Sequence, residues 1–506
     1  MRADLPACLT AGLEARPSWR IPLDERDIAV RLECDGVTDT VAAHTYGFRD
    51  VHDMASEWYG QLHAAQEGDL RTPPRKNLLV EHIRGTAFAL PLAICCVVMI
   101  CFGYSLWGGD LDGSAAAAVA IGVVASFIVT GGIVQAMAWQ GLFYAGSGDF
   151  RMSAVACRRW TGYGGIILAS AAVAALLFNA QFGWLSGELA WLAASFCIAM
   201  GALWIGTGIL YIVEAPLHVT AATVYGITVV FILHRALGMS LLESQILGVL
   251  TAALAAFLTG FLILRKRHTG DASRVYPRMV RQTIFQTAPY LVYGSLYYLL
   301  LFADRIVAWT AQTGAAETPV VFRGDYELPH DIALLGFIIG VGWVHSACRS
   351  FYDRVGVLLR SCDLEKTQWF NNRMLEFHLR QIAIFLPVAY AVNAIIWFSA
   401  QSFGLLATPL TERVALIALA AFPLLTVGLW NVSLLFALSL PWAALPPAIC
   451  AVLVNLSCGY TLSRIWSYDL AIFGFLAGSA VFCIASSVSV QRRFRRLDYY
   501  YLVSGA

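Results

Sequence analysis

Polar and aromatic side chains gather in one otherwise apolar stretch of the chain, between residues 282 and 309. Spacings of four and three residues repeat along its first part, which places these side chains on one face of a helix. Tyrosine rings in such a row can stack on the apolar faces of sugars, which would suit a carbohydrate path. The alternative is an interface between helices, with the hydroxyls satisfied by neighbours or headgroups. The candidate residues are Gln282, Gln286, Tyr290, Tyr293, Tyr297, Tyr298, Asp304, Arg305 and Trp309.

Two charged residues, Asp304 and Arg305, lie near the end of this stretch. Because they are adjacent on a helix, their side chains diverge and cannot form a simple helical ion pair. Counted from Arg281, Asp304 lies roughly 34 Å along the helix axis, which predicts a position near the outer membrane surface. If the helix starts closer to Pro289, Asp304 lies deeper, and an acid inside a membrane is a functional candidate.

Motifs for covalent chemistry are absent from the sequence. It contains no phosphate-binding G-x-x-x-x-G-K-[ST] loop, no G-x-S-x-G, no H-E-x-x-H and no metal-binding His/Cys spacing. Asp110 and Asp112 form a D-x-D pattern, but in a short loop predicted to face away from cytoplasmic nucleotide sugars. The twelve cysteines include no C-x-x-C pair and are interpreted as small packing residues. We therefore predict no enzymatic activity, no metal and no cofactor. A membrane-embedded glycosyltransferase or acyltransferase is the alternative.

The composition predicts a membrane protein. Hydrophobic residues make up 58% of the 506 residues and charged residues only 13%, whereas a soluble domain carries about 25% charge. Apolar runs of about 20 residues are long enough to cross a bilayer as helices. Twelve such runs are predicted, at 86–107, 115–144, 161–182, 188–213, 218–234, 241–264, 284–309, 332–348, 381–403, 414–438, 442–462 and 467–490.

The positions of lysine and arginine predict the orientation of these helices. If both termini lie in the cytoplasm, twenty-three basic residues flank the helices on the inner side and five lie outside or at an outer helix end. Acidic residues, including Glu327 and Asp331, then fall in the outer loops. This asymmetry follows the positive-inside rule. We predict an all-α, multi-pass protein of a bacterial inner membrane, with no nucleic-acid partner.

The basic segment 265–281 divides the predicted helices into six plus six, a layout common in transporters built from two halves. Residues 1–80 are polar and predict a small cytoplasmic module. Within it, 28–33 and 40–46 read as strands and 51–65 as a helix, so a ββα fold is the expectation. A folded adaptor and a barely ordered extension both fit these residues. The predicted domains are 1–80, a bundle at 82–264, a linker at 265–281, a bundle at 282–491 and a basic, aromatic tail at 492–506.

Three stretches around the seventh and eighth helices carry a family resemblance. They are YGSLYYLLLFADRIVAWTAQTG (293–314), DYELPHDIALLGFIIGVG (325–342) and SFYDRV (350–355). Their order of an acid-base pair, a tryptophan, a T-G, a tyrosine and proline, and an aromatic pair resembles the Pel exopolysaccharide inner-membrane transporter family. The matching residues are Asp304, Arg305, Trp309, Thr313, Gly314, Tyr326, Pro329, Phe351 and Tyr352.

The resemblance implies a member of the flippase superfamily, with two six-helix bundles around a central cavity. It implies export of a nascent exopolysaccharide beside a cytoplasmic glycosyltransferase and a cyclic-di-GMP receptor. A flippase for another lipid-linked substrate is a further alternative. The sequence departs from the family at 343–350, which lacks the expected carboxylates, and at 213–218, where a basic turn is expected.

Overall fold

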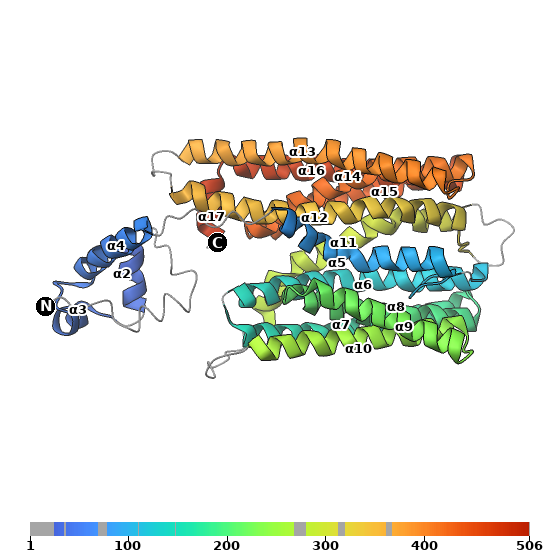
Figure 1. Ribbon diagram of the computed structural model, residues 1–506, viewed down its shortest axis with the longest axis horizontal. Coiled ribbons are helices and arrows are strands. Elements are labelled where there is room, and N and C mark those ends of the chain that lie inside the picture. Colours follow the sequence, from blue (N-terminus) through green and yellow to red (C-terminus); the bar gives the residue numbers. More distant parts are fainter. Residues whose placement is uncertain are drawn as a thin grey trace. The chain divides into compact units, whose positions relative to one another are not determined.

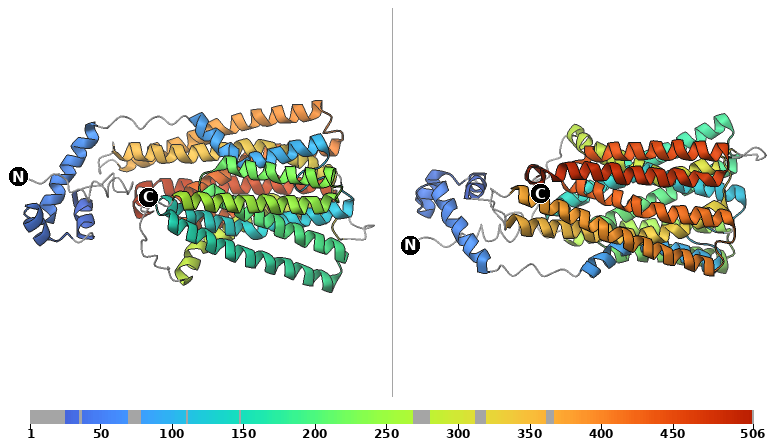
Figure 2. Two further views of the ribbon diagram at one scale, coloured as in Figure 1. Left: turned by 60° about the horizontal axis from the view of Figure 1, so that its bottom comes forward. Right: turned by 90° about the horizontal axis from the view of Figure 1, so that it is seen from above.

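The fold consists of long helices. The computed structural model describes residues 25–34, 37–68, 78–109, 111–146, 148–267, 280–311, 319–360 and 367–504. Within these residues, twelve helices are long and apolar enough to cross a membrane, which confirms the predicted all-α polytopic class. The membrane helices run in broadly the same direction (Figures 1 and 2).

Six helices form what we call the first bundle. Small residues bring them close: an added Cβ at Gly122 on the second helix would lie 2.4 Å from the Ala193 carbonyl oxygen on the fourth. A core around Phe196, Leu203 and Val249 is buried among them. These helices are α5 (Leu78–Phe102), α6 (Gly113–Gly146), α7 (Phe150–Phe182), α8 (Gly187–Ile212), α9 (Pro216–Phe231) and α10 (Leu241–Arg267).

The next six helices form the second bundle, whose core is larger and richer in aromatic rings, with Trp430, Phe422 and Phe475 fully buried. The linker prediction at 265–281 mostly lies outside the described residues, between the ends of α10 and α11. The helices are α11 (Val280–Trp309), α12 (Gly324–Arg360), α13 (Thr367–Ser402), α14 (Pro409–Ala437), α15 (Leu445–Ile465) and α16 (Ile472–Phe494), and a short α17 (Leu497–Ser504) follows in the tail.

Two helices of the second bundle are much longer than the sequence predicts. The eighth span was expected at 332–348, but α12 covers Gly324–Arg360. The sequence of 364–382 fits either an amphipathic helix at the inner membrane surface or a charged loop, and its described part is the start of the continuous helix α13. Hydropathy marks only the lipid-facing section of a helix, so polar turns at either end are not detected. The extra turns of α12 add polar residues, including Glu327 and His330, to the bundle.

The N-terminal residues form a separate compact unit of three helices, α2 (Glu25–Cys34), α3 (Asp39–Tyr46) and α4 (Val51–Gly68). The predicted helix at 51–65 is confirmed, but the strands at 28–33 and 40–46 are wrong. Ile28, Ala29 and Leu32 share one helical face and are buried in a core with Met54 and Trp58. Short alternating patterns are compatible with either a strand or a helix, and in this unit the packing of helical faces selects the helix.

Candidate transport site

The tyrosine row on α11 divides between two environments. Tyr293 and Tyr297 are buried within the second bundle, where their ring centroids lie 6.1 Å apart and Tyr293 meets Phe436 edge-on at 5.1 Å. Tyr290 contacts both bundles, with Phe436 of the second at 4.7 Å and Trp139 of the first at 5.1 Å, and Tyr298 makes ring contacts with the first bundle. Because Tyr298 directly follows Tyr297, it lies on a different side of α11 from the other three tyrosines.

Aromatic rings from both bundles meet in an aromatic seam. Trp139 of α6 stacks on Tyr290, with centroids 5.1 Å apart and an angle of 23° between the planes. Phe127 of α6 stacks on Tyr298 at 5.5 Å and on Phe302 at 5.7 Å, both at 18°. Near-parallel stacking is one of the preferred geometries of aromatic pairs. The seam consists of Phe127, Trp139 and Trp204 from the first bundle and Tyr290, Tyr298 and Phe302 from the second.

Sequence reasoning missed Phe127, Trp204 and Phe302 as members of the seam. Each is an ordinary apolar residue of a membrane helix, and no local signal distinguishes it from a lipid-facing one. For Trp139 the sequence does offer a signal that it does not face lipid, because it lies between two polar residues, Gln135 and Gln140, in an apolar helix. Of the two glutamines, Gln140 is buried and its Oε1 accepts a hydrogen bond of 2.8 Å from Trp160 Nε1.

Glycines let α6 and α11 touch where the seam crosses the middle of both helices. An added Cβ at Gly132 would lie 2.1 Å from the Leu291 carbonyl oxygen, and one at Gly294 would lie 2.4 Å from the Gly131 carbonyl oxygen. Small residues of this kind allow close backbone approach between membrane helices. Side chains of α11 also pack at this point: an added Cβ at Gly131 would lie 2.3 Å from Tyr298 Cδ2, and one at Gly132 would lie 3.0 Å from Ser295 Oγ.

Asp304 lies in a buried polar cluster rather than facing headgroups. Its side chain is fully buried, and Oδ2 accepts a 2.6 Å hydrogen bond from the Tyr326 hydroxyl of α12. His330 Nε2 lies 3.3 Å from the same oxygen. The early start of α12 creates this arrangement, because Tyr326 and His330 belong to its first two turns.

Arg305 forms ion pairs with two carboxylates of α12. It bonds to Glu327 and, at 2.5 Å, to Asp331, while Trp309 Nε1 donates to the other Glu327 oxygen at 2.8 Å. The prediction that Glu327 and Asp331 occupy an outer loop is wrong: both belong to α12, and Glu327 is buried. Three candidates, Asp304, Arg305 and Trp309, are thus brought together through a second helix.

The remaining candidates lie away from this cluster. Gln286 is an exposed residue near the start of α11, and the side chain of Gln282 lies outside the described residues. The α11 row therefore has three parts in order along the helix: an exposed start, the aromatic seam, and the charged cluster.

A second ionic cluster joins the two bundles at the other end of α12. Glu81 of α5 is buried and lies 3.4 Å from His345 and 3.9 Å from Arg349, both of α12. Arg349 also bonds at 3.1 Å to Glu214, in the turn between α8 and α9. Gly85 assists this contact, since an added Cβ there would lie 2.5 Å from His345 Cβ. Charge and close packing therefore hold α5 against α12.

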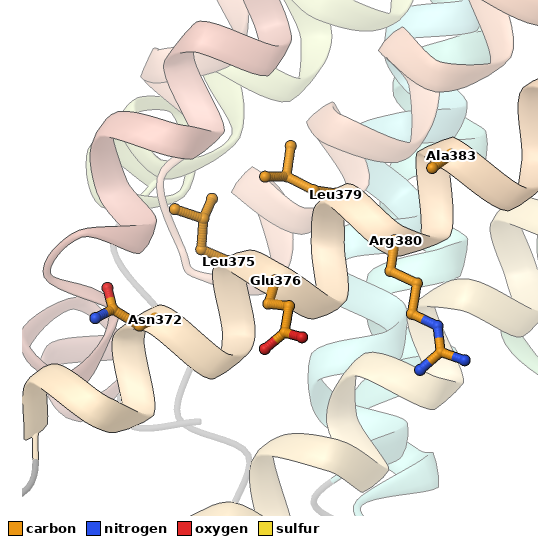
Figure 3. Close-up of a pocket in the computed structure, with 6 residues that line it drawn as sticks. All are labelled: Asn372, Leu375, Glu376, Leu379, Arg380 and Ala383. Carbon is orange, nitrogen blue, oxygen red and sulfur yellow. The ribbon is translucent and has the colours of Figure 1, made fainter.

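A groove lies apart from both clusters, along the first half of α13 (Figure 3). All the residues that line it come from this one helix, so the groove does not reach the seam. It combines leucines with one acidic and one basic side chain. The lining residues are Asn372, Leu375, Glu376, Leu379, Arg380 and Ala383.

Several solved structures have a similar fold. The outward-facing multidrug resistance MATE family transporter of the MOP superfamily has a TM-score of 0.58 at 14% identity, covering 84% of this chain and 98% of its own. The structure of MATE in complex with MaD3S has a TM-score of 0.58 at 15% sequence identity, covering 83% of this chain and 96% of its own. A MOP superfamily transporter from Pyrococcus furiosus Vc1 has a TM-score of 0.56 at 14% sequence identity, covering 83% of this chain and 95% of its own. This chain shares their fold.

Residues 151–501 match the family model PelG, described as "Putative exopolysaccharide Exporter (EPS-E)". The chain belongs to this family. No curated protein sequence matches it. The family is one of exopolysaccharide exporters, and the twelve membrane-length helices agree with a multi-pass membrane protein.

Proposed function

We propose that the protein carries a growing exopolysaccharide across the bacterial cytoplasmic membrane, between its two bundles and along the aromatic seam. The observation that supports this route is the set of near-parallel ring stacks that cross from α6 to α11. Each stack hides two ring faces while the bundles are together. When the bundles separate, those faces become available to the apolar faces of sugar rings.

The geometry around the seam favours such a separation. The α6–α11 contact at Gly132 and Gly294 is a close approach of the two backbones, and the ring of Tyr298 packs beside it on Gly131. The Glu81 cluster joins α5 to α12 through polar contacts, which can exchange with water as the bundles move. Both features suit an interface that opens and closes repeatedly.

The test is polymer export by cells that carry seam variants. We expect Trp139→Ala and Tyr290→Leu each to reduce secreted polymer by about ten-fold, the equivalent of about 1.4 kcal/mol of lost stacking. The amount of inserted protein should stay unchanged. Trp191→Ala is the matched control, because this tryptophan is 65% exposed on the first bundle. Normal export by both seam variants would reject the route.

The family resemblance also supports a place in a synthase complex. We propose that a cytoplasmic glycosyltransferase and a cyclic-di-GMP receptor deliver the chain to this exporter. Purification of the full-length protein from its own host under mild conditions should bring down both subunits. Purification of the exporter alone, from cells that are making polymer, would contradict this assembly.

A further inference from the structure

We propose that the first bundle binds one phospholipid of the cardiolipin class, which carries two phosphate groups in its headgroup, between the start of α7 and the end of α10. No part of the export proposal assigns a lipid site. Three features support it: four exposed cations without acidic partners, a contact that joins the two helix ends, and rows of exposed apolar side chains beside the cations.

The four cations come in two pairs, one on each helix. Arg158 and Arg159 are neighbours in the third turn of α7, and Arg265 and Lys266 are neighbours in the last turn of α10. All four side chains are exposed. In the part of the chain that the structure describes, none of them forms an ion pair with an acid.

Two acids at the same end of the bundle are engaged elsewhere. Glu81 lies 3.6 Å from Arg84 and 3.9 Å from Arg349. Glu214 lies 3.1 Å from Arg349. These carboxylates therefore do not balance the four positive charges on α7 and α10, and an anionic ligand would offset the repulsion among those charges.

A contact between an arginine and an aromatic ring joins the two helix ends. The guanidinium carbon of Arg158 lies 5.9 Å from the ring centroid of Phe261 on α10, which is within the range of a cation–π interaction. Phe261 is one helical turn before Arg265, so both lie on the same face of α10. The cations of the two helices therefore face one region, where a single headgroup can reach both pairs.

The cations also lie at the depth of lipid phosphates. The apolar run of α7 begins at residue 161 and that of α10 ends at residue 264, so each cation is within three residues of an apolar boundary. That separation is roughly 5 Å by helical rise. The headgroup layer on each side of a bilayer is about 5–8 Å thick. Phosphates in this layer are within reach of all four side chains.

Rows of exposed apolar side chains continue from the cations into the membrane. On α10, Leu254, Leu258 and Leu262 are each more than half exposed, and Lys266 continues their spacing of four. On α7, Arg159 begins a row with spacings of three, four and seven, which also keep to one helical face. The exposed apolar members of that row are Tyr163, Ile166, Val173 and Leu177.

The helix dipole accounts for only one of the two pairs. Basic residues in the last turn of a helix are stabilised by its free carbonyl groups, which suits Arg265 and Lys266. Arg158 and Arg159 instead lie nearer the start of α7, where the dipole favours anions. A free phosphate ion could meet the cations but would leave the apolar rows uncovered. A headgroup with two phosphates matches the two pairs, and its acyl chains match the rows.

The experiment uses the full-length protein in lipid nanodiscs of three compositions. They contain phosphatidylcholine alone, phosphatidylcholine with cardiolipin, or phosphatidylcholine with phosphatidylglycerol at the same total lipid charge. We expect cardiolipin to raise Tm by mass action, and to raise it more than phosphatidylglycerol does. Native mass spectrometry of the protein released from the cardiolipin nanodiscs should find one cardiolipin retained per chain.

The combined change Arg158→Gln, Arg265→Gln should weaken cardiolipin binding by about thirty-fold, because each cation near the membrane surface contributes about 1 kcal/mol of attraction. The combined change Arg495→Gln, Arg496→Gln is the matched control, because it removes two adjacent exposed arginines that follow α16 in the second bundle. It should keep the original affinity for cardiolipin. All four side chains are exposed, so both variants should keep their Tm in phosphatidylcholine alone.

Three results would overturn the proposal. They are equal stabilisation by phosphatidylglycerol, stabilisation by inorganic phosphate in phosphatidylcholine nanodiscs, and full cardiolipin affinity in Arg158→Gln, Arg265→Gln. An equal loss of affinity in the control variant would also overturn it, because the attraction would then belong to any cationic surface. All of these are measured without polymer, so their failure would leave the export proposal intact.

Discussion

The two bundles have the same number of membrane helices but very different interiors. In the first bundle the described buried polar side chains are mostly Ser, Thr and Gln, and its one buried charged residue, Glu81, lies near a helix end. The second bundle buries Asp304, Arg305, Glu327 and Asp469. Intramembrane charges are costly and mark functional regions. The second bundle therefore holds most of the buried charge among the described residues, while both bundles contribute rings to the seam.

The largest difference between the bundles is expected when the buried arginine of the second bundle, Arg305, is removed. Arg305→Leu leaves Glu327 buried without its partner and should lower the free energy of unfolding by about 3–5 kcal/mol. Arg84→Leu is the matched change in the first bundle, where Arg84 is half-exposed and lies 3.6 Å from Glu81. It should cost about 1 kcal/mol or less. Thermal unfolding of the purified proteins checks both, and equal losses would contradict the difference between bundles.

The contact between the bundles can be tested by adding a single methyl group. Gly294→Ala places a Cβ against the backbone of α6, 2.4 Å from the Gly131 oxygen, and should cost about 1–3 kcal/mol while displacing the seam. Secreted polymer should fall with it. Gly162→Ala on α7 meets nothing within 4 Å and is the control. Unchanged stability and export in Gly294→Ala would show that the crossing is looser than this packing implies.

The aromatic row offers a test that separates path from core. Replacing Tyr290, Tyr293 and Tyr297 together by leucine should abolish export while the protein still inserts. The double change Tyr293→Leu, Tyr297→Leu acts on second-bundle packing and should lower Tm with a smaller loss of export than Tyr290→Leu. Export rates compared at equal amounts of inserted protein decide this. A larger loss of export from the double change than from Tyr290→Leu would indicate that the path lies inside the second bundle.

The smallest effect concerns single hydroxyl groups. Tyr326→Phe removes the hydrogen bond to Asp304 Oδ2 and should cost about 1–3 kcal/mol. Tyr104→Phe is the first-bundle counterpart, because its buried hydroxyl has no partner in the described structure. That change should be neutral or slightly stabilising. Chemical or thermal unfolding gives the change in the free energy of unfolding for both variants. A larger loss in Tyr326→Phe than in Tyr104→Phe would support the difference between a polar and an apolar interior.

The sequence located most of the helices but only part of the charged cluster. Asp304, Arg305 and Trp309 stand out because charges and an indole follow a long apolar run. Glu327 and Asp331 are predicted in a loop, because hydropathy does not detect polar turns that extend a membrane helix. The predicted orientation, with both termini in the cytoplasm, stays a prediction.

The sequence by itself determined that about twelve helices cross a membrane and that one of them carries a row of tyrosines, since length, hydropathy and helical spacing are local properties. Only the tertiary structure decided which tyrosines meet the first bundle and which side chains neutralise Arg305. These are contacts between residues far apart in the chain, such as Phe127 with Tyr298. They depend on how glycines and small residues let particular helices approach, which no single segment specifies.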